Sequence, residues 1–290
     1  MMLKKMPKDC NICTPLYVKD TSIIHNRKRP FNMKNLRFVL PLLLLLLVPT
    51  ILVASKQRET IFRKSLPLAS AREVKSDISF FAGELYMNVN SKKLVECYYG
   101  YKDIYIVPYM IYKEVDRIGY LTIKSKREKT EQLDNRSDDN KWKLELNKNV
   151  KNDVSIELMA GVAQVNLEGA KLSNFAFKMT AGESHINLRN TSVPKIRCNM
   201  MAGKTSLDLS GKWSNDCDAE IKGGVGQINV KVPFGTGVKI EVSGLLGEVN
   251  IPFFNKDNRT YTNDAWGKSK HSITLDISGA IGEINVEMVE

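Results

Sequence analysis

The chain has little histidine. Three of its 290 residues are histidine, His25, His185 and His271, and no two of them have the His-x-x-x-His spacing of a metal site. His185 takes an outward position on a predicted strand and lies far in sequence from His271. Metal centres and nucleophilic triads need an imidazole close to other ligands or to a nucleophile, so we expect neither.

Cysteine is scarce as well, with five residues. Cys10 and Cys13 have C-x-x-C spacing but no second pair, which argues against a zinc site. Cys198 and Cys217 both face the predicted core, one repeat apart and offset by two residues. Their Cα atoms would lie roughly 8 Å apart, too far for a disulfide. We expect both to be small core residues, and Cys97 has no evident partner.

No phosphate-binding loop is complete. Gly203-Lys204-Thr205 is similar to the end of a P-loop, but Cys198 stands where that motif needs glycine and no helix is expected to follow. The pair Gly224 and Gly226 fails as a dinucleotide motif because a strand is predicted after it. These absences predict that the chain binds no cofactor.

Acidic side chains form no clear catalytic pair. Glu157, Glu220 and Glu241 share one outward column of the predicted repeat, but Lys178 and Asn199 interrupt it. Enzymes that cleave polysaccharides cluster carboxylates around the scissile bond. We therefore expect a solvated face here and a protein that is not an enzyme.

Positive charge is concentrated at the N-terminus. The net charge is +11, and residues 1–55 contribute +7 of it through nine Lys/Arg and two Asp. The rest of the chain is close to neutral for its length. A nucleic-acid partner is not expected, because that function needs a basic face on the folded domain.

A short pattern recurs every 21 residues. Each copy places an Asn or Asp between two apolar residues, as in Val165-Asn166-Leu167. The copies are centred on Asn166, Asn187, Asp208, Asn229 and Asn250. A glycine precedes the first four by five positions, at Gly161, Gly182, Gly203 and Gly224. A fixed period of this length predicts a solenoid whose stacked turns share one core.

Strict alternation surrounds each copy. One predicted apolar column consists of Val154, Phe175, Ile196, Cys217 and Val238, and along each strand mostly polar residues alternate with the apolar ones. This alternation predicts half-buried strands joined by small-residue corners. The Asn column then faces outward, and its stacked amides can hydrogen-bond to one another. Without neighbouring carboxylates it is a poor cation site, so no metal is expected.

The period breaks after Ile251. The next copy is Ile284-Asn285-Val286, 35 residues after Asn250. The extra residues fall within Phe253–Tyr261 and end near Trp266. Such an insertion predicts either a binding loop or an apolar cap over the open end of the core, and we favour the cap. Further corner glycines are expected at Gly226, Gly247 and Gly282.

An early copy precedes the array. Residues 82–89, with Gly83 and Asn88, match residues 181–188 closely. The polar stretch 124–140 then reads as a charged loop or linker, and Trp142, Leu144 and Leu146 restart the alternation. We therefore expect an N-terminal β domain with its linker at 56–140 and a solenoid at 141–290.

Residues 1–55 contain an almost wholly apolar run, Phe38–Ala54. If translation starts at Met33, the segment has the three parts of a secretory signal: a charged start, this apolar run, and small residues suited to cleavage at 53–55. Read from Met1, the basic tail stays inside and the run becomes a membrane anchor. Either alternative places residues 56–290 outside the cytoplasm, in the periplasm or at the cell surface.

Several of these segments resemble a known family. The early Ala82-Gly83-Glu84-Leu85 unit, the stretch 142–146 and the copies at 224–230 and 279–286 are similar to bacterial toast-rack proteins. A related domain ends the cell-wall-active antibiotic response (LiaF-like) proteins. The resemblance covers about residues 70–290. It implies an all-β toast-rack, a single-stranded β-solenoid, and for LiaF-like members a link to envelope-stress signalling.

The sequence thus predicts a non-enzymatic envelope protein. Its rigid β-solenoid surface would serve adhesion, assembly or sensing, with an envelope protein or a glycan as partner, and the apolar segment would contact the membrane if uncleaved. Two alternatives stay open: a polysaccharide-binding or polysaccharide-cleaving β-helix, and a LiaF-like regulator.

Overall fold

The computed structural model describes residues 60–101, 106–127, 140–244 and 246–290. The chain divides into two compact units, residues 1–55 and 56–290. The predicted start at Met33, the apolar run Phe38–Ala54 and the residues Cys10, Cys13 and His25 lie outside the described residues. In the described part, no helix is long and apolar enough to cross a membrane.

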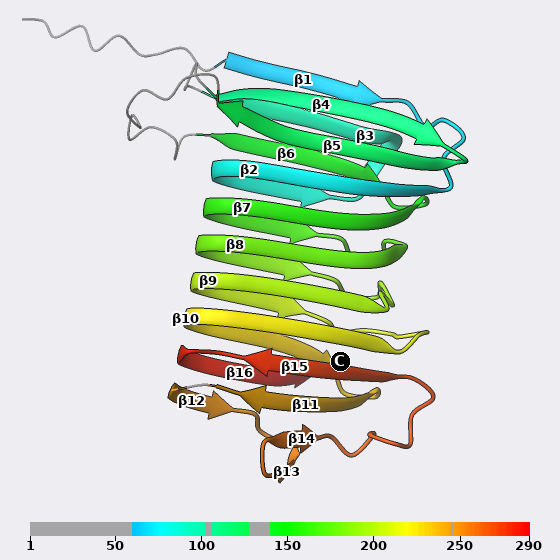
Figure 1. The fold of residues 1–290 in the computed structure, drawn as a ribbon. Helices are drawn as coiled ribbons and strands as arrows, with labels where there is room; N and C mark the ends of the chain where they lie inside the picture. The colour runs from blue at the N-terminus through cyan, green and yellow to red at the C-terminus, as the bar shows by residue number, and fades with distance from the viewer. Residues whose placement is uncertain (1–59, 102–105, 128–139, 245) are drawn as a thin grey trace, which may run out of the picture. The chain divides into compact units, whose positions relative to one another are not determined.

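Within the described residues the second unit is a 16-stranded sheet, which confirms the all-β prediction. Its centre is a parallel stack of five long strands (Figure 1), which follow one another along the sheet as β2 (Glu73–Asn88), β7 (Lys151–Asn166), β8 (Leu172–Asn187), β9 (Lys195–Asp208) and β10 (Cys217–Pro233). Each strand turns back on itself at a corner and continues unbroken, so one bent strand makes one turn of the solenoid.

The strand register follows the predicted shift only in part. Partners are 21 residues apart from β7 to β8 and from β8 to β9, as in Val154, Phe175 and Ile196. From β9 to β10 the shift is 23 residues, and Ile196 pairs with Ala219. The prediction of one period through all five copies is therefore wrong.

The cause lies in the loop after β9. Counted between register partners, nine residues separate Asp208 from Asp218, whereas seven separate Asn187 from Lys195, so the chain is two residues longer after β9. This longer segment buries Trp213, whose indole Nε1 donates to the carbonyl of Leu209 at 2.7 Å. The two extra residues shift the register of β10 against β9 from 21 residues to 23. Asp208 consequently faces Lys231, and Asn229 faces Ser206.

The same shift corrects two further predictions, the offset between Cys198 and Cys217 and the shared column of glutamates. Cys198 pairs with Ile221, which places Cys217 four residues out of line with Cys198 rather than two. Glu157 belongs to a column with Lys178, Asn199 and Lys222. Glu220 and Glu241 instead flank Asp276.

The corners form a column of glycines with φ between +120° and +157°. Its members in spatial order are Gly83, Gly161, Gly182, Gly203, Gly226, Gly282 and Gly247. Gly226 pairs with Gly203, so the prediction that Gly224 occupies this column is wrong. A Cβ on Gly203 would overlap the carbonyl oxygen of Gly182, which is why no other residue fits.

The C-terminal turn is inserted out of sequence order. β15 (Ser272–Ser278) and β16 (Ile281–Val289) lie between β10 and the earlier pair β11 (Gly237–Ser243) and β12 (Leu246–Asn250), as Figure 1 shows. Asn285 therefore stands between Asn229 and Asn250. The expectation that the copies stack in chain order is wrong for this last turn.

The insertion after Ile251 forms an edge cover. β13 (Asn255–Asp257) and β14 (Thr260–Thr262) make an antiparallel hairpin, and β14 pairs with the outer edge of β11. Tyr261 is buried there, whereas Phe253 is 86% exposed. The insertion therefore caps the β11 edge, as favoured from the sequence. It does so mainly by pairing its backbone with β11 and less by covering the core with apolar side chains.

The N-terminal end has a different construction. β5 (Ile118–Arg127) and β6 (Lys141–Asn147) pair in parallel with the two halves of β2, and β4 (Ile106–Val115), β3 (Asn90–Tyr101) and β1 (Thr60–Leu66) extend the sheet antiparallel. Residues 124–127, expected in a linker, belong to β5. Because β2 also pairs with β7, one sheet runs across the boundary expected near residue 140.

The core is continuous along the stack. Inward columns such as Val154, Phe175, Ile196 and Ala219 are almost fully buried. At the N-terminal end Trp142 stacks between Phe80 and Tyr99, with ring centroids 3.7 and 3.5 Å away. Burial of this kind contributes about 25 cal/mol per Å² of apolar surface and stabilises the turns jointly, since no single turn encloses a core.

We expect Gly203→Ala to destabilise the protein by more than about 3 kcal/mol, because it combines a strained φ of +124° with overlap against a fixed carbonyl. Gly235→Ala is the matched control, since a Cβ there meets nothing within 4 Å, and it should change stability by less than about 0.5 kcal/mol. Urea unfolding measures both. Equal losses would contradict the corner assignment.

Candidate functional site

A polar groove of about 720 Å³ crosses the second halves of β2, β7, β8, β9 and β10. Its polar lining consists of Tyr86, Asn88, Asn90, Gln164, Asn166, His185, Asn187, Ser206, Asp208, Asn229 and Lys231. These side chains point outward because their neighbours, Val165 and Ile186 among them, are buried in the core. Alternation along each strand and register between strands together build the groove.

Two rows run along the groove, across the strands. The inner row is Tyr86, Gln164, His185, Ser206 and Asn229. The outer row contains Asn166, Asn187, Asp208 and Lys231 in register, with Asn88 at the end of β2. Neighbouring strands lie about 4.8 Å apart, so each row repeats at that spacing.

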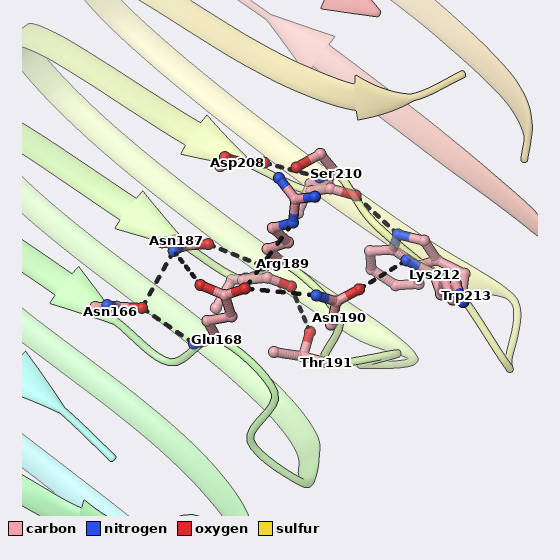
Figure 2. A network of polar contacts seen from close by, with 12 residues as sticks. Asn166, Glu168, Asn187, Arg189, Asn190, Thr191, Asp208, Ser210, Lys212 and Trp213 are labelled. Atoms are coloured by element: carbon pink, nitrogen blue, oxygen red, sulfur yellow. Dashed lines mark hydrogen bonds and ion pairs between the residues drawn. The ribbon is translucent and has the colours of Figure 1, made fainter. Parts of the chain in front are cut away.

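The residues of the outer row form the turns that end the strands. The Oδ1 atom of each Asn or Asp accepts a hydrogen bond from the backbone N–H two residues later, as Asn166 does from Glu168 at 3.2 Å and Asn187 from Arg189 at 3.0 Å. Asn88 and Asp208 do the same with Asn90 and Ser210. Figure 2 shows three of these contacts. Such Asx turns end a strand and start the following loop.

Amide stacking is also present, in two separate places. Asn187 Nδ2 donates to Asn166 Oδ1 at 3.1 Å, and Asn285 Nδ2 donates to Asn229 Oδ1 at 3.1 Å. Asp208 follows Asn187 but has no N–H to donate, so the first ladder stops there. The single ladder expected from the sequence is thus divided by the register shift, and Asn250 and Asn285 lie outside the groove.

The loops beyond the outer row are tied together (Figure 2). Asn190 donates to Glu168 at 3.5 Å and accepts from the backbone N–H of Lys212 at 2.8 Å. Arg189 lies 3.9 Å from Glu168. These contacts join three successive turns, so the groove has a fixed border.

Charge in the groove is balanced. His185 lies 3.2 Å from Glu183, which also pairs with Lys204 at 3.8 Å. Tyr86 donates to Glu84 at 2.9 Å, and this hydrogen bond raises the pKa of Tyr86. The hydroxyl therefore stays neutral at physiological pH. Asp208 and Lys231 are adjacent in register and opposite in sign.

Reactive groups are not brought together here. Among the described residues no three His, Cys, Asp or Glu side chains are arranged to hold a metal ion. His271 lies near Asp216, at 3.9 Å, on another part of the sheet. Lys222 and Arg197 pair with Glu220, and the hydrogen bond from Lys222 lowers the pKa of Glu220. That carboxylate is ionised and ion-paired, unlike a general acid.

The sequence pattern located the outer row better than the inner one. Of the predicted Asn column, Asn88, Asn166, Asn187, Asp208 and Asn229 line the groove. The pattern does not identify Tyr86, Asn90, Gln164, Ser206 or Lys231 as site residues, and it predicts only an outward position for His185. On β2, β7, β8 and β9 the inner-row residue lies two positions before the Asn or Asp, on the same face of the strand, whereas on β10 the register shift puts Asn229 itself in this row.

The family follows from comparison with known proteins. The model of the N-terminal domain of toast_rack, DUF2154, matches residues 54–195 and again residues 173–231, which together exceed half of the chain. The chain belongs to the toast-rack family. No curated protein matches this toast-rack chain.

One solved structure shares the fold. A proposed cell adhesion protein from Clostridium sporogenes ATCC 15579 is 27% identical, with a TM-score of 0.61, over 80% of this chain and 100% of that one. A proposed adhesin from Bacteroides fragilis NCTC 9343 is 10% identical, with a TM-score of 0.33, over 79% of this chain and 98% of that one. The second likeness is too loose to support an argument.

We expect the three described cysteines of this toast-rack protein to be unreactive when it is folded. Burial raises the pKa of Cys97, Cys198 and Cys217 to about 12. Iodoacetamide at about pH 8 should modify them only in urea, as peptide mapping can show. Unfolded thiols ionise near pH 8.5, so stability should fall as pH rises from there toward 12. Labelling of Cys198 in the native protein would contradict this prediction.

Asp208→Asn should extend the amide ladder and raise stability by up to about 1 kcal/mol, because the new Nδ2 can donate to Asn187 while Oδ1 still accepts from Ser210. Asp208→Ala, which removes both functions, should lower stability by about 1 kcal/mol. Urea titration compares the two variants. A loss in both would show that the Asp208 charge itself is needed.

Proposed function

We propose that this toast-rack protein is a non-enzymatic surface protein that acts in adhesion outside the cytoplasm, with the polar groove as its contact surface. The observation that carries the proposal is the likeness to the Clostridium sporogenes protein, which this chain covers over its full length at a TM-score of 0.61. That protein's name proposes a role in cell adhesion.

The construction of the sheet supports this role. Adhesion needs a surface whose side chains are held in place before contact, because ordering them on binding costs free energy. Asx turns fix the outer row, and loop contacts join consecutive turns. A stacked solenoid also resists local distortion, since each turn is paired on both sides.

The apolar run Phe38–Ala54 supports export. Cleavage before residue 56 would release the protein, whereas retention of the run would anchor it. Mass spectrometry of the mature N-terminus distinguishes the two, and both agree with an extracytoplasmic role.

The test uses intact cells. Protease added outside should cleave the protein, and a deletion strain should adhere less to its natural surface, with adherence restored by the wild-type chain. Gln164→Ala should restore adherence less well than Asn199→Ala, a change on the other half of a turn. A chain protected from protease, or adherence unchanged by deletion, would overturn the proposal. An altered response to wall-active antibiotics, with adherence intact, would favour the LiaF-like alternative.

A further inference from the structure

The side chains that line the polar groove restrict the classes of ligand that it can bind. Of its two rows, the inner one consists of a phenol, an imidazole, a hydroxyl and two carboxamides. The only formal charges of the lining, Asp208 and Lys231, are neighbours of opposite sign at one end. A surface of this kind offers no net attraction to a polyanion or a polycation.

Several groove side chains have unused hydrogen-bonding capacity. Within the described part of the chain, the side chains of Gln164 and Ser206 have no hydrogen-bond partner, and the same holds for the Nδ2 atoms of Asn88 and Asn166. These groups lie on neighbouring turns. In the free protein they bind water, which a ligand hydroxyl can replace one for one.

The amides on the outer row are already oriented. The Oδ1 atoms of Asn88 and Asn166 are held by backbone N–H groups at 3.2 Å. Each planar carboxamide therefore has its acceptor committed and its donor available. These two pre-positioned donors lie on neighbouring turns about 4.8 Å apart, which suits a ligand that presents two or more acceptors along its length.

We infer that the polar groove binds a neutral polysaccharide, with the chain running along the two rows and across the strands. Sugar hydroxyls both donate and accept, as carboxamide, hydroxyl and imidazole groups require. The ring of Tyr86 at one end offers a flat apolar face for a sugar ring. Five strands span roughly 19 Å, which accommodates an oligosaccharide rather than a single sugar.

This inference rests on the proposed adhesive function and names the class of molecule that the groove contacts. Peptides and lipids fit less well, because the groove presents no unpaired strand edge and because the apolar side chains along it, Met87, Val165, Ile186 and Leu207, are buried. The acids beside the inner row, Glu84 and Glu183, are paired with Lys141 and Lys204, so this border offers an acidic polysaccharide no excess of positive charge.

The experiment presents the full-length protein, in detergent, to immobilised neutral glucans, mannans and galactans, with polygalacturonate and dextran sulfate as anionic probes. We expect binding to at least one neutral polymer. Its affinity should change little between about 50 and about 500 mM salt, because no charge pairing is involved. Binding confined to the anionic probes and abolished by salt would overturn the inference.

Variants locate the site. Gln164→Ala and Ser206→Ala should each weaken binding by about three- to tenfold, the loss expected for one or two hydrogen bonds to ligand. Neither side chain has an internal hydrogen bond in the described residues, so both variants should retain the wild-type thermal transition. Asn199→Ala, on the exposed face of the other half of β9, is the matched control and should bind normally.

The outcomes separate this inference from the function it rests on. If neutral polymers fail to bind while the protein still supports cell adherence, the ligand class is wrong and adhesion stands. If neutral polymers bind and Gln164→Ala and Ser206→Ala leave affinity unchanged, the groove is not the site. Weaker glycan binding together with weaker adherence in these two variants is the expected result.

Discussion

The close approach of one backbone corner to the next is the constraint on which this structure depends. At the corner of each turn the chain adopts a φ that L side chains rarely adopt, and any Cβ would overlap the preceding corner's carbonyl oxygen. Glycine at these positions lets neighbouring turns keep the hydrogen-bond spacing of a sheet through the bend. The inward columns can then meet from both halves of each turn and form one core.

The groove is a consequence of the same register. Because the glycines align from β2 to β10, the residues beyond them align as well, and Gln164, His185 and Ser206 become a row. Asx turns at the ends of the strands then fix where that row stops. A rigid polar surface therefore results from backbone packing, and its side chains are free to differ in chemistry, as they do among Tyr86, Gln164 and Ser206.

Much of the fold could be predicted because alternation is a local property. The inward positions Val154, Ile156 and Leu158, the corner Gly161 and the outward Asn166 are all recognisable in one copy of the repeat. The pairing of distant copies could not be read in the same way. Two added residues in the loop that buries Trp213 shift the next turn, and nothing in the flanking strands reveals them. Half of the candidate site was missed for a related reason: the inner row has no common residue type.

The sequence by itself determined the strand class, the face of each residue, the positions of most corners and the family resemblance, because each depends on residues close together in the chain. Tertiary structure alone decided that β15 and β16 enter between β10 and β11, that Asn229 leaves the first ladder, and that eleven polar side chains of six strands share one groove. These features depend on which strand edges meet. A strand edge offers the same backbone donors and acceptors to any partner strand. Which strands pair is therefore decided by how the side chains of the whole core pack together.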